Sequence, residues 1–157
     1  MRLALTLLGS SLLLLGCSSD GDSSSTSASG DAFAALRARC VEKINAYRAT
    51  LGAPPYAAWP EQGTCSDQEA ASDSQTGKAH GAFGKCTEMA QNECPGWPGP
   101  PETMVDKCLE MMWAEGPGSD FSKHGHYINM SSTKYSKVAC GFFQTADGKW
   151  WSVQNFR

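Results

Sequence analysis

The sequence predicts an α+β fold, a three-layer α-β-α sandwich in which a small antiparallel sheet is covered by helices on both faces. Two patterns carry this prediction. Apolar residues recur at three- and four-residue steps in the first part of the domain, as in helices, and alternate in the last third, as in strands. The predicted strands are apolar on both faces, and such a sheet requires a layer of helix on each side.

The 157-residue chain divides into three parts. Residues 1–16 carry one basic residue, Arg2, followed by an apolar run, which predicts an export signal too short to span a membrane. Residues 17–31 begin with Cys17 and are rich in Ser, Asp and Gly, which predicts a flexible linker. Residues 32–157 are long enough for one domain with its own hydrophobic core.

Cys17 is the predicted attachment point of a lipid anchor. The run Leu14-Leu15-Gly16-Cys17 matches the lipobox of bacterial lipoproteins, in which the cysteine is acylated and becomes the mature N-terminus. A plain signal peptide is the alternative. Acyl chains, at about 0.8 kcal/mol per buried methylene, hold a protein on a membrane. We therefore expect an exported protein of the cell envelope. Ser18 stands where an Asp would favour inner-membrane retention, which favours the outer membrane.

Three segments have a helical pattern: residues 32–50, 65–79 and 102–115. The apolar face of the first is formed by Phe33, Leu36, Cys40, Ile44, Tyr47 and Leu51. The second segment has only a small apolar side. In the third, the stripe through Met104, Cys108 and Met111 continues to Glu115, which would direct this carboxylate along the core-facing side. The alternative is that Glu115 lies in water at the helix terminus.

The last third of the chain has an alternating pattern in three segments: residues 126–132, 138–145 and 150–156. The turn sequence Asp147-Gly148 between the last two predicts a β-hairpin. Residues 81–101 contain many Gly and Pro residues, which predicts a loop.

Seven cysteines are present, and assigning Cys17 to the lipid leaves six: Cys40, Cys65, Cys86, Cys94, Cys108 and Cys140. An even number in an exported domain predicts three disulfides, each worth roughly 2–4 kcal/mol. The sequence leaves the connectivity open. Cys86–Cys94 is the favoured local pair, since it would brace the predicted loop. A zinc cluster is the rival interpretation, but the chain contains no Cys-x-x-Cys pair.

Two histidines and two glutamates are the candidate site residues: His80, Glu88, Glu115 and His126. His124, two residues before His126, is a further candidate. Burying unpaired carboxylates is unfavourable, so a convergence of these groups would indicate a bound cation or a polar ligand. Taken singly, each has an ordinary structural explanation, such as a surface histidine or a solvated acid.

Six short motifs follow one another along the domain: Asn45-Ala46-Tyr47-Arg48, Glu88-Met89-Ala90, Glu115 after Trp113, Gly125-His126-Tyr127, Val138-Ala139-Cys140-Gly141 and Trp151-Ser152-Val153-Gln154-Asn155-Phe156. In their order and spacing the domain resembles the CAP superfamily, which includes cysteine-rich secretory proteins, insect-venom antigens and plant pathogenesis-related proteins. Thr87 and Met89 flank Glu88 where the family usually has Gly and Asn, and the spacing from Trp113 to Glu115 is one residue shorter than usual.

The resemblance implies a cleft that binds a divalent cation such as zinc in several members of the superfamily. It places His80, Glu88, Glu115 and His126 in this cleft. Imidazoles and carboxylates suit a borderline metal. The preferred arrangement has the two histidines as direct ligands and the glutamates holding the histidines or water.

The resulting prediction is a lipid-anchored CAP-domain binding module of the bacterial envelope, monomeric, with a small lipid or an envelope protein as its partner. The alternative is a metal-dependent hydrolase, whose zinc-bound water would be activated by a glutamate. The sequence contains no HExxH arrangement and no nucleophile pattern, so an enzymatic function is the less favoured hypothesis. A purely structural surface protein is the third possibility. The formal net charge of −3 and the lack of a basic patch argue against nucleic acid.

Overall fold

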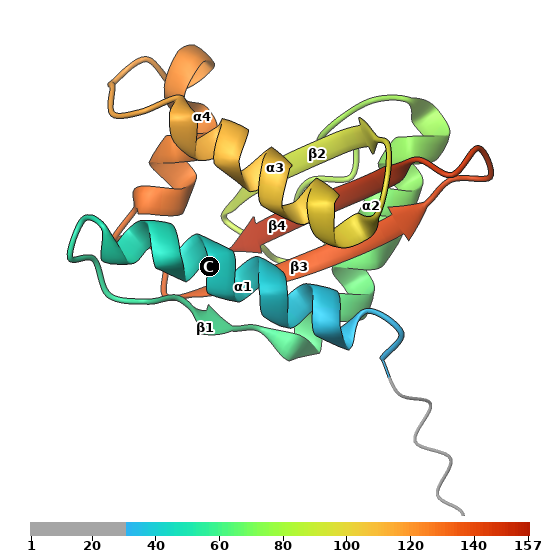
Figure 1. Ribbon diagram of the computed structural model, residues 1–157, viewed down its shortest axis with the longest axis horizontal. Helices are drawn as coiled ribbons and strands as arrows, with labels where there is room; N and C mark the ends of the chain where they lie inside the picture. Colours follow the sequence, from blue (N-terminus) through green and yellow to red (C-terminus); the bar gives the residue numbers. More distant parts are fainter. Residues whose placement is uncertain (1–30) are drawn as a thin grey trace, which may run out of the picture.

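A computed structural model describes residues 31–157 of the chain (Figure 1). Its helices are α1 (Ala34–Ala49), α2 (Gly63–Thr76), α3 (Pro101–Ala114) and α4 (Phe121–Ser131), with a short 3-10 helix, η1, over Pro60–Gln62. Its strands are β1 (Ala57–Ala58), β2 (Ala90–Trp97), β3 (Lys137–Gln144) and β4 (Trp150–Phe156).

The four strands form one sheet in the order β1-β3-β4-β2. The three longer strands are antiparallel, and the two-residue β1 adds a parallel partner to β3. Helix α2 packs on one face of the sheet, whereas α1, α3 and α4 lie over the other (Figure 1). This three-layer arrangement confirms the predicted α+β sandwich.

The two faces of the sheet are covered by different kinds of side chain. Apolar side chains fill the side of α1, α3 and α4, among them Ile44, Met104, Leu109, Met130, Phe142 and Phe156. The α2 side buries polar groups instead, including Glu69 and Asp73 of α2 and Gln91 and Asn155 of the sheet. Helix α2 also lies very close to strand β3 on this side, since a Cβ at Gly141 in β3 would lie 2.1 Å from a backbone atom of α2.

A buried arginine fixes the end of α4. Arg48 of α1 is 1% exposed, and its guanidinium donates hydrogen bonds to the carbonyls of Met130 and Ser132, both at 2.8 Å. Three residues earlier, Asn45 exchanges two hydrogen bonds with the backbone of Tyr56. Arg48 therefore ties α1 to the end of the helix that carries His126, and Asn45 ties α1 to the segment before β1.

Three disulfides join the layers: Cys40–Cys140, Cys65–Cys86 and Cys94–Cys108. The predicted number is confirmed, but the favoured Cys86–Cys94 pair is wrong. Cys94 bonds to α3 and Cys86 bonds to α2. Because these helices cover opposite faces of the sheet, the two cysteines belong to different layers and cannot form the local bridge.

Two predicted segments take a different structure. Residues 126–132 lie almost entirely in α4, not in a strand, because the helix begins earlier, where the Asp120 carboxylate accepts a hydrogen bond from the Ser122 N–H at 3.0 Å. The predicted loop over 81–101 contains strand β2, which pairs with β4 despite its Gly and Pro residues. A register shift between Cys94 and Trp97 accommodates those residues.

The predicted signal sequence, the lipidated Cys17 and nearly all of the linker lie outside the described residues. Within residues 31–157, no helix combines the length and the apolar character that crossing a bilayer requires.

Candidate functional site

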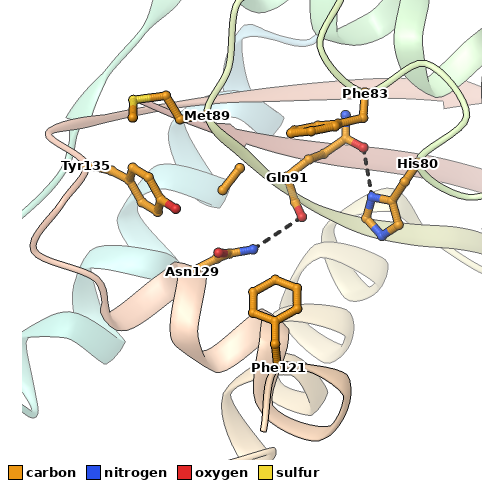
Figure 2. A pocket seen from close by; sticks show the side chains of 8 residues that line it. His80, Phe83, Met89, Gln91, Phe121, Asn129 and Tyr135 are labelled. Carbon is orange, nitrogen blue, oxygen red and sulfur yellow. Dashed lines mark hydrogen bonds between the residues drawn. The ribbon is translucent and has the colours of Figure 1, made fainter. Parts of the chain in front are cut away.

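A groove runs beside β2, between the loop that follows α2 and the helix α4. One part of it, the polar chamber, has a volume of about 250 Å³ and is lined by His80, Gln91, Glu115, His126 and Asn129, among others. The adjoining part, the apolar chamber, has a volume of about 330 Å³. The two chambers share four lining residues, His80, Gln91, Phe121 and Asn129, and therefore adjoin as parts of one groove. Figure 2 shows these four residues among the side chains that line the apolar chamber.

His80 enters the groove from the loop after α2. Its backbone has a φ of 59°, a left-handed conformation that non-glycine residues seldom adopt. This conformation is held by Glu93 of β2, whose Oε2 accepts a hydrogen bond from the His80 N–H at 2.5 Å. The side chain of Glu93 is completely buried, and its Oε2 lies 3.8 Å from the imidazole Nδ1. The site thus fixes His80 through its main chain as well as its ring.

Gln91 determines how the His80 ring is protonated. Its amide Nε2 donates to Glu69 at 3.2 Å and to Asn155 at 3.0 Å, so its Oε1 must face the His80 Nδ1, 2.9 Å away (Figure 2). Because an amide oxygen only accepts, this Nδ1 carries the proton. The Nε2 of His80 is then left with a free lone pair.

Glu115 and His126 form the second half of the polar chamber. Glu115 follows α3, and its Oε2 accepts hydrogen bonds from the backbone N–H groups of His126 at 3.0 Å and Tyr127 at 3.3 Å. Its Oε1 accepts from the Nδ1 of the His126 ring. The His126 Nε2 is again free. Both imidazoles therefore have a partner on Nδ1 and offer Nε2, the arrangement found in metal-binding histidines.

The other two candidates lie outside both chambers. Glu88 is buried, and its carboxylate accepts hydrogen bonds from the N–H groups of Gly84 and Cys86. His124 donates through Nδ1 to the carbonyls of Glu115 and Gly116, at 2.7 and 3.0 Å. Glu88 therefore folds the loop, and His124 ties the end of α3 to α4. Of the predicted site residues, the structure brings His80, Glu115 and His126 to one cavity.

A second group of metal-ligand types lies behind the sheet. Ligand atoms of Glu69, Cys86 and Glu88 lie within 4.8 Å of one another, and all three residues are buried. The Cys86 sulfur, however, is bonded to Cys65 and cannot serve as a thiolate. This leaves two neighbouring carboxylates, a pair that can share one proton.

Buried acids continue from this pair toward His80. Burial raises the pKa of Glu69 to about 7 and that of Glu93 to about 7, and it also raises the pKa of Asp73. Oxygen atoms of all three residues are buried with no hydrogen-bond donor among the described residues. A shared proton between Asp73 and Glu93, and another between Glu69 and Glu88, would satisfy three of these four oxygens: one on Glu69, one on Glu93 and one of the two on Asp73.

Sequence reasoning missed Gln91, Glu93 and Asn129. Gln91 and Glu93 fell in a segment predicted to be a loop, and Asn129 fell in a predicted strand. A usable signal was the polar run Gln91-Asn92-Glu93, because consecutive polar residues are expected on a loop but become buried partners when the segment is a strand.

The donor set fits a divalent cation in part. Two imidazole Nε2 atoms suit zinc or another borderline metal. His80, Glu115 and His126 do not bring three ligand atoms within 4.8 Å of one another, since the group described above is the one set of three that meets this distance within residues 31–157. Water or a bound ligand would have to complete the coordination.

The fold is similar to two solved structures, each 13% identical in sequence to this chain. The crystal structure of Na-ASP-1 has a TM-score of 0.56, with 77% of this chain aligned to 38% of that one. The crystal structure of a hookworm platelet inhibitor has a TM-score of 0.54, with 79% of this chain aligned to 69% of that one. At this identity the likeness shows the fold alone.

No curated protein matches the sequence. The family model described as CAP, the cysteine-rich secretory protein family, matches residues 41–156. This match covers the second half of α1 and every later helix and strand, and it includes every residue of the polar chamber. The chain therefore belongs to the CAP family.

Proposed function

We propose that this protein is a CAP-domain binding module of the bacterial cell envelope, held by a lipid on Cys17, whose groove binds a divalent cation and a small ligand beside it. The observation that carries the proposal is the pair of histidines in one cavity. His80 and His126 come from distant parts of the chain, and each has its Nδ1 occupied and its Nε2 free.

The roles of the residues follow from these contacts. His80 and His126 are the proposed cation ligands. Gln91 and Glu115 orient the two rings from behind, and Glu115 adds a negative charge that favours a cation. The open volume of the two chambers leaves room for water or a ligand on the cation. The lipid anchor, the outer-membrane location and the monomeric state are proposed from the sequence.

The proposal is tested by the melting temperature of the full-length protein with and without zinc. A ligand at one hundred times its Kd stabilises a protein by about 2.7 kcal/mol. For a domain of this size that corresponds to a rise of roughly 5–15 °C. His126→Ala should lose the rise. Glu42→Ala is the control, because it removes an exposed potential metal ligand of α1 that lies outside both chambers, and it should keep the rise.

Two results would contradict the proposal. Zinc could leave the melting temperature unchanged in every variant, which would remove the cation site. Alternatively, Glu42→Ala and His126→Ala could lose the rise equally, which would place the zinc elsewhere. Peptide and ester substrates, assayed with and without a chelator, would identify the hydrolase if turnover were present and chelator-sensitive.

A further inference from the structure

Exposed apolar side chains gather around one end of the groove. Within residues 31–157, five large apolar side chains are exposed, and three of them line the apolar chamber: Phe83 (49%), Met89 (63%) and Phe121 (62%). Figure 2 shows these three around Gln91 and Asn129, with Tyr135 beside Met89. Apolar side chains clustered at a cavity, and not scattered, indicate a binding surface for an apolar group.

Asn129 places a hydrogen-bond acceptor where the hollows of this face meet. It is 3% exposed and lines both chambers and a third hollow beyond them. Its Nδ2 donates to the Asn92 Oδ1 at 2.9 Å and to the Gln91 carbonyl at 3.4 Å, which fixes the direction of the amide. Its Oδ1 has no partner among the described residues. An unpartnered oxygen that is accessible from the groove can accept a hydrogen bond from an N–H group of a ligand.

The groove as a whole is rich in acceptors, and among residues 31–157 no Lys or Arg side chain lines its two chambers. The two free imidazole Nε2 atoms, the Glu115 carboxylate and the Asn129 Oδ1 all accept. No Lys or Arg of the described chain lines either chamber, and Lys134 lines only the third hollow. An anionic headgroup would find no Lys or Arg here, whereas an ammonium or guanidinium group would find the Glu115 carboxylate and several other acceptors.

We infer that the groove binds an extended peptide segment of a partner protein, one that carries an arginine or lysine close to a large apolar side chain. The basic group enters the polar chamber beside Glu115, a backbone N–H donates to the Asn129 Oδ1, and the apolar side chain fills the space between Phe83 and Phe121. This rests on the proposed function of the groove as a ligand site. The basic group and a divalent cation use the same lone pairs, so the peptide binds the metal-free form.

The test uses the full-length protein in detergent with EDTA and fluorescein-labelled heptapeptides. Each peptide carries one Arg and one Phe, one to three positions apart in either order, in a Gly-Ser background. Matched peptides replace the Arg by Glu or the Phe by Ala. By fluorescence anisotropy, the best Arg/Phe peptide should bind about tenfold more tightly than either matched peptide.

Two protein variants separate the groove from the general surface. Phe121→Ser removes an exposed ring from the apolar chamber and should weaken the peptide about tenfold. Met111→Ser is the matched control: its side chain is 61% exposed, lies outside the groove, and its removal should leave the affinity unchanged. Slowed hydrogen exchange near Asn129 on peptide addition would locate the bound segment.

Three outcomes would overturn the inference: equal binding of the Glu-containing peptides, equal weakening by Phe121→Ser and Met111→Ser, or binding of a dansylated fatty acid in the absence of peptide binding. The last would assign the apolar chamber to an acyl chain. A zinc-dependent melting temperature without peptide binding would remove this inference alone. Peptide binding without a zinc response would instead remove the cation site.

Discussion

The buried acids of the α2 side make stability fall as the pH rises through neutrality. Glu69 and Glu93 each have a pKa of about 7 in the folded protein, raised above the ordinary 4.5 mainly by burial. Between pH 4.5 and about pH 7, the two carboxyl groups are therefore protonated in the folded chain and ionised in the unfolded chain. The resulting stabilisation is complete below pH 4.5 and is lost as the pH passes 7.

The magnitude follows from the difference between the two pKa values. At about 1.4 kcal/mol per pH unit, a rise from 4.5 to about 7 is worth about 3 kcal/mol for one carboxyl group. We therefore expect the free energy of unfolding to decrease by several kcal/mol between pH 5 and pH 8. Most domains of this size have a total stability of about 5–15 kcal/mol, so the loss should be easily measured.

Urea unfolding at a series of pH values, with the disulfides intact, measures this directly. Glu93→Gln removes one titrating group and keeps an oxygen to accept from the His80 N–H, so its pH dependence should be about half as steep. Glu42→Gln, on the exposed surface of α1, should follow the wild type. A wild-type stability that is constant or increases from pH 5 to pH 8 would refute the reasoning, as would an unchanged slope in Glu93→Gln.

Three further predictions concern the elements that hold the site. Replacing both Cys65 and Cys86 by Ser opens a loop of 21 residues and should lower the free energy of unfolding by about 3 kcal/mol, measured in urea. The zinc-dependent rise in melting temperature should become smaller as well. An undiminished rise would show that the disulfide does not position the loop that carries His80. Gln91→Leu should weaken the zinc affinity about 10–100-fold, measured by calorimetry, because it removes the partner of the His80 Nδ1. Gln144→Leu, at an exposed position, should leave the zinc affinity unchanged. Equal affinities in the two variants would show that the Gln91 amide does not orient the His80 ring. Gly141→Ala should destabilise the fold by about 1–3 kcal/mol in thermal unfolding, because its Cβ would overlap a backbone atom of α2, and a wild-type melting temperature would contradict that packing.

Helices and hairpins with strong local patterns were predictable from the sequence. The spacing of Leu36, Cys40 and Ile44 predicted α1, and all three are buried in the core. The Asp147-Gly148 turn predicted the β3–β4 hairpin, which the strand pairing confirms. In both cases the residues that decide the structure are close neighbours in the chain.

Two segments were not predictable because distant partners decide them. Residues 90–97 read as a loop, but pairing with β4 makes them a strand. The segment 126–132 has an alternating pattern, yet it continues a helix that starts after Asp120. Short apolar runs fit either period, so tertiary contacts select between them.

The candidate site also contains residues that sequence motifs predict and residues whose roles only tertiary contacts decide. Family motifs led to His80, Glu115 and His126, which line one chamber. They did not identify Gln91 as the partner of His80, because that role depends on an amide orientation set by α2 and β4. Glu88 instead serves the loop that carries it.

By itself, the sequence determined the three helices predicted before residue 116, the terminal hairpin and the presence of three disulfides, since these depend on local periodicity, turn residues and an even number of cysteines. Only the tertiary structure decided which cysteines pair, which polar residues stand behind each imidazole and which acids are buried. The physical reason is that these properties depend on contacts between layers, where burial and hydrogen-bond geometry are set by residues far apart in the chain.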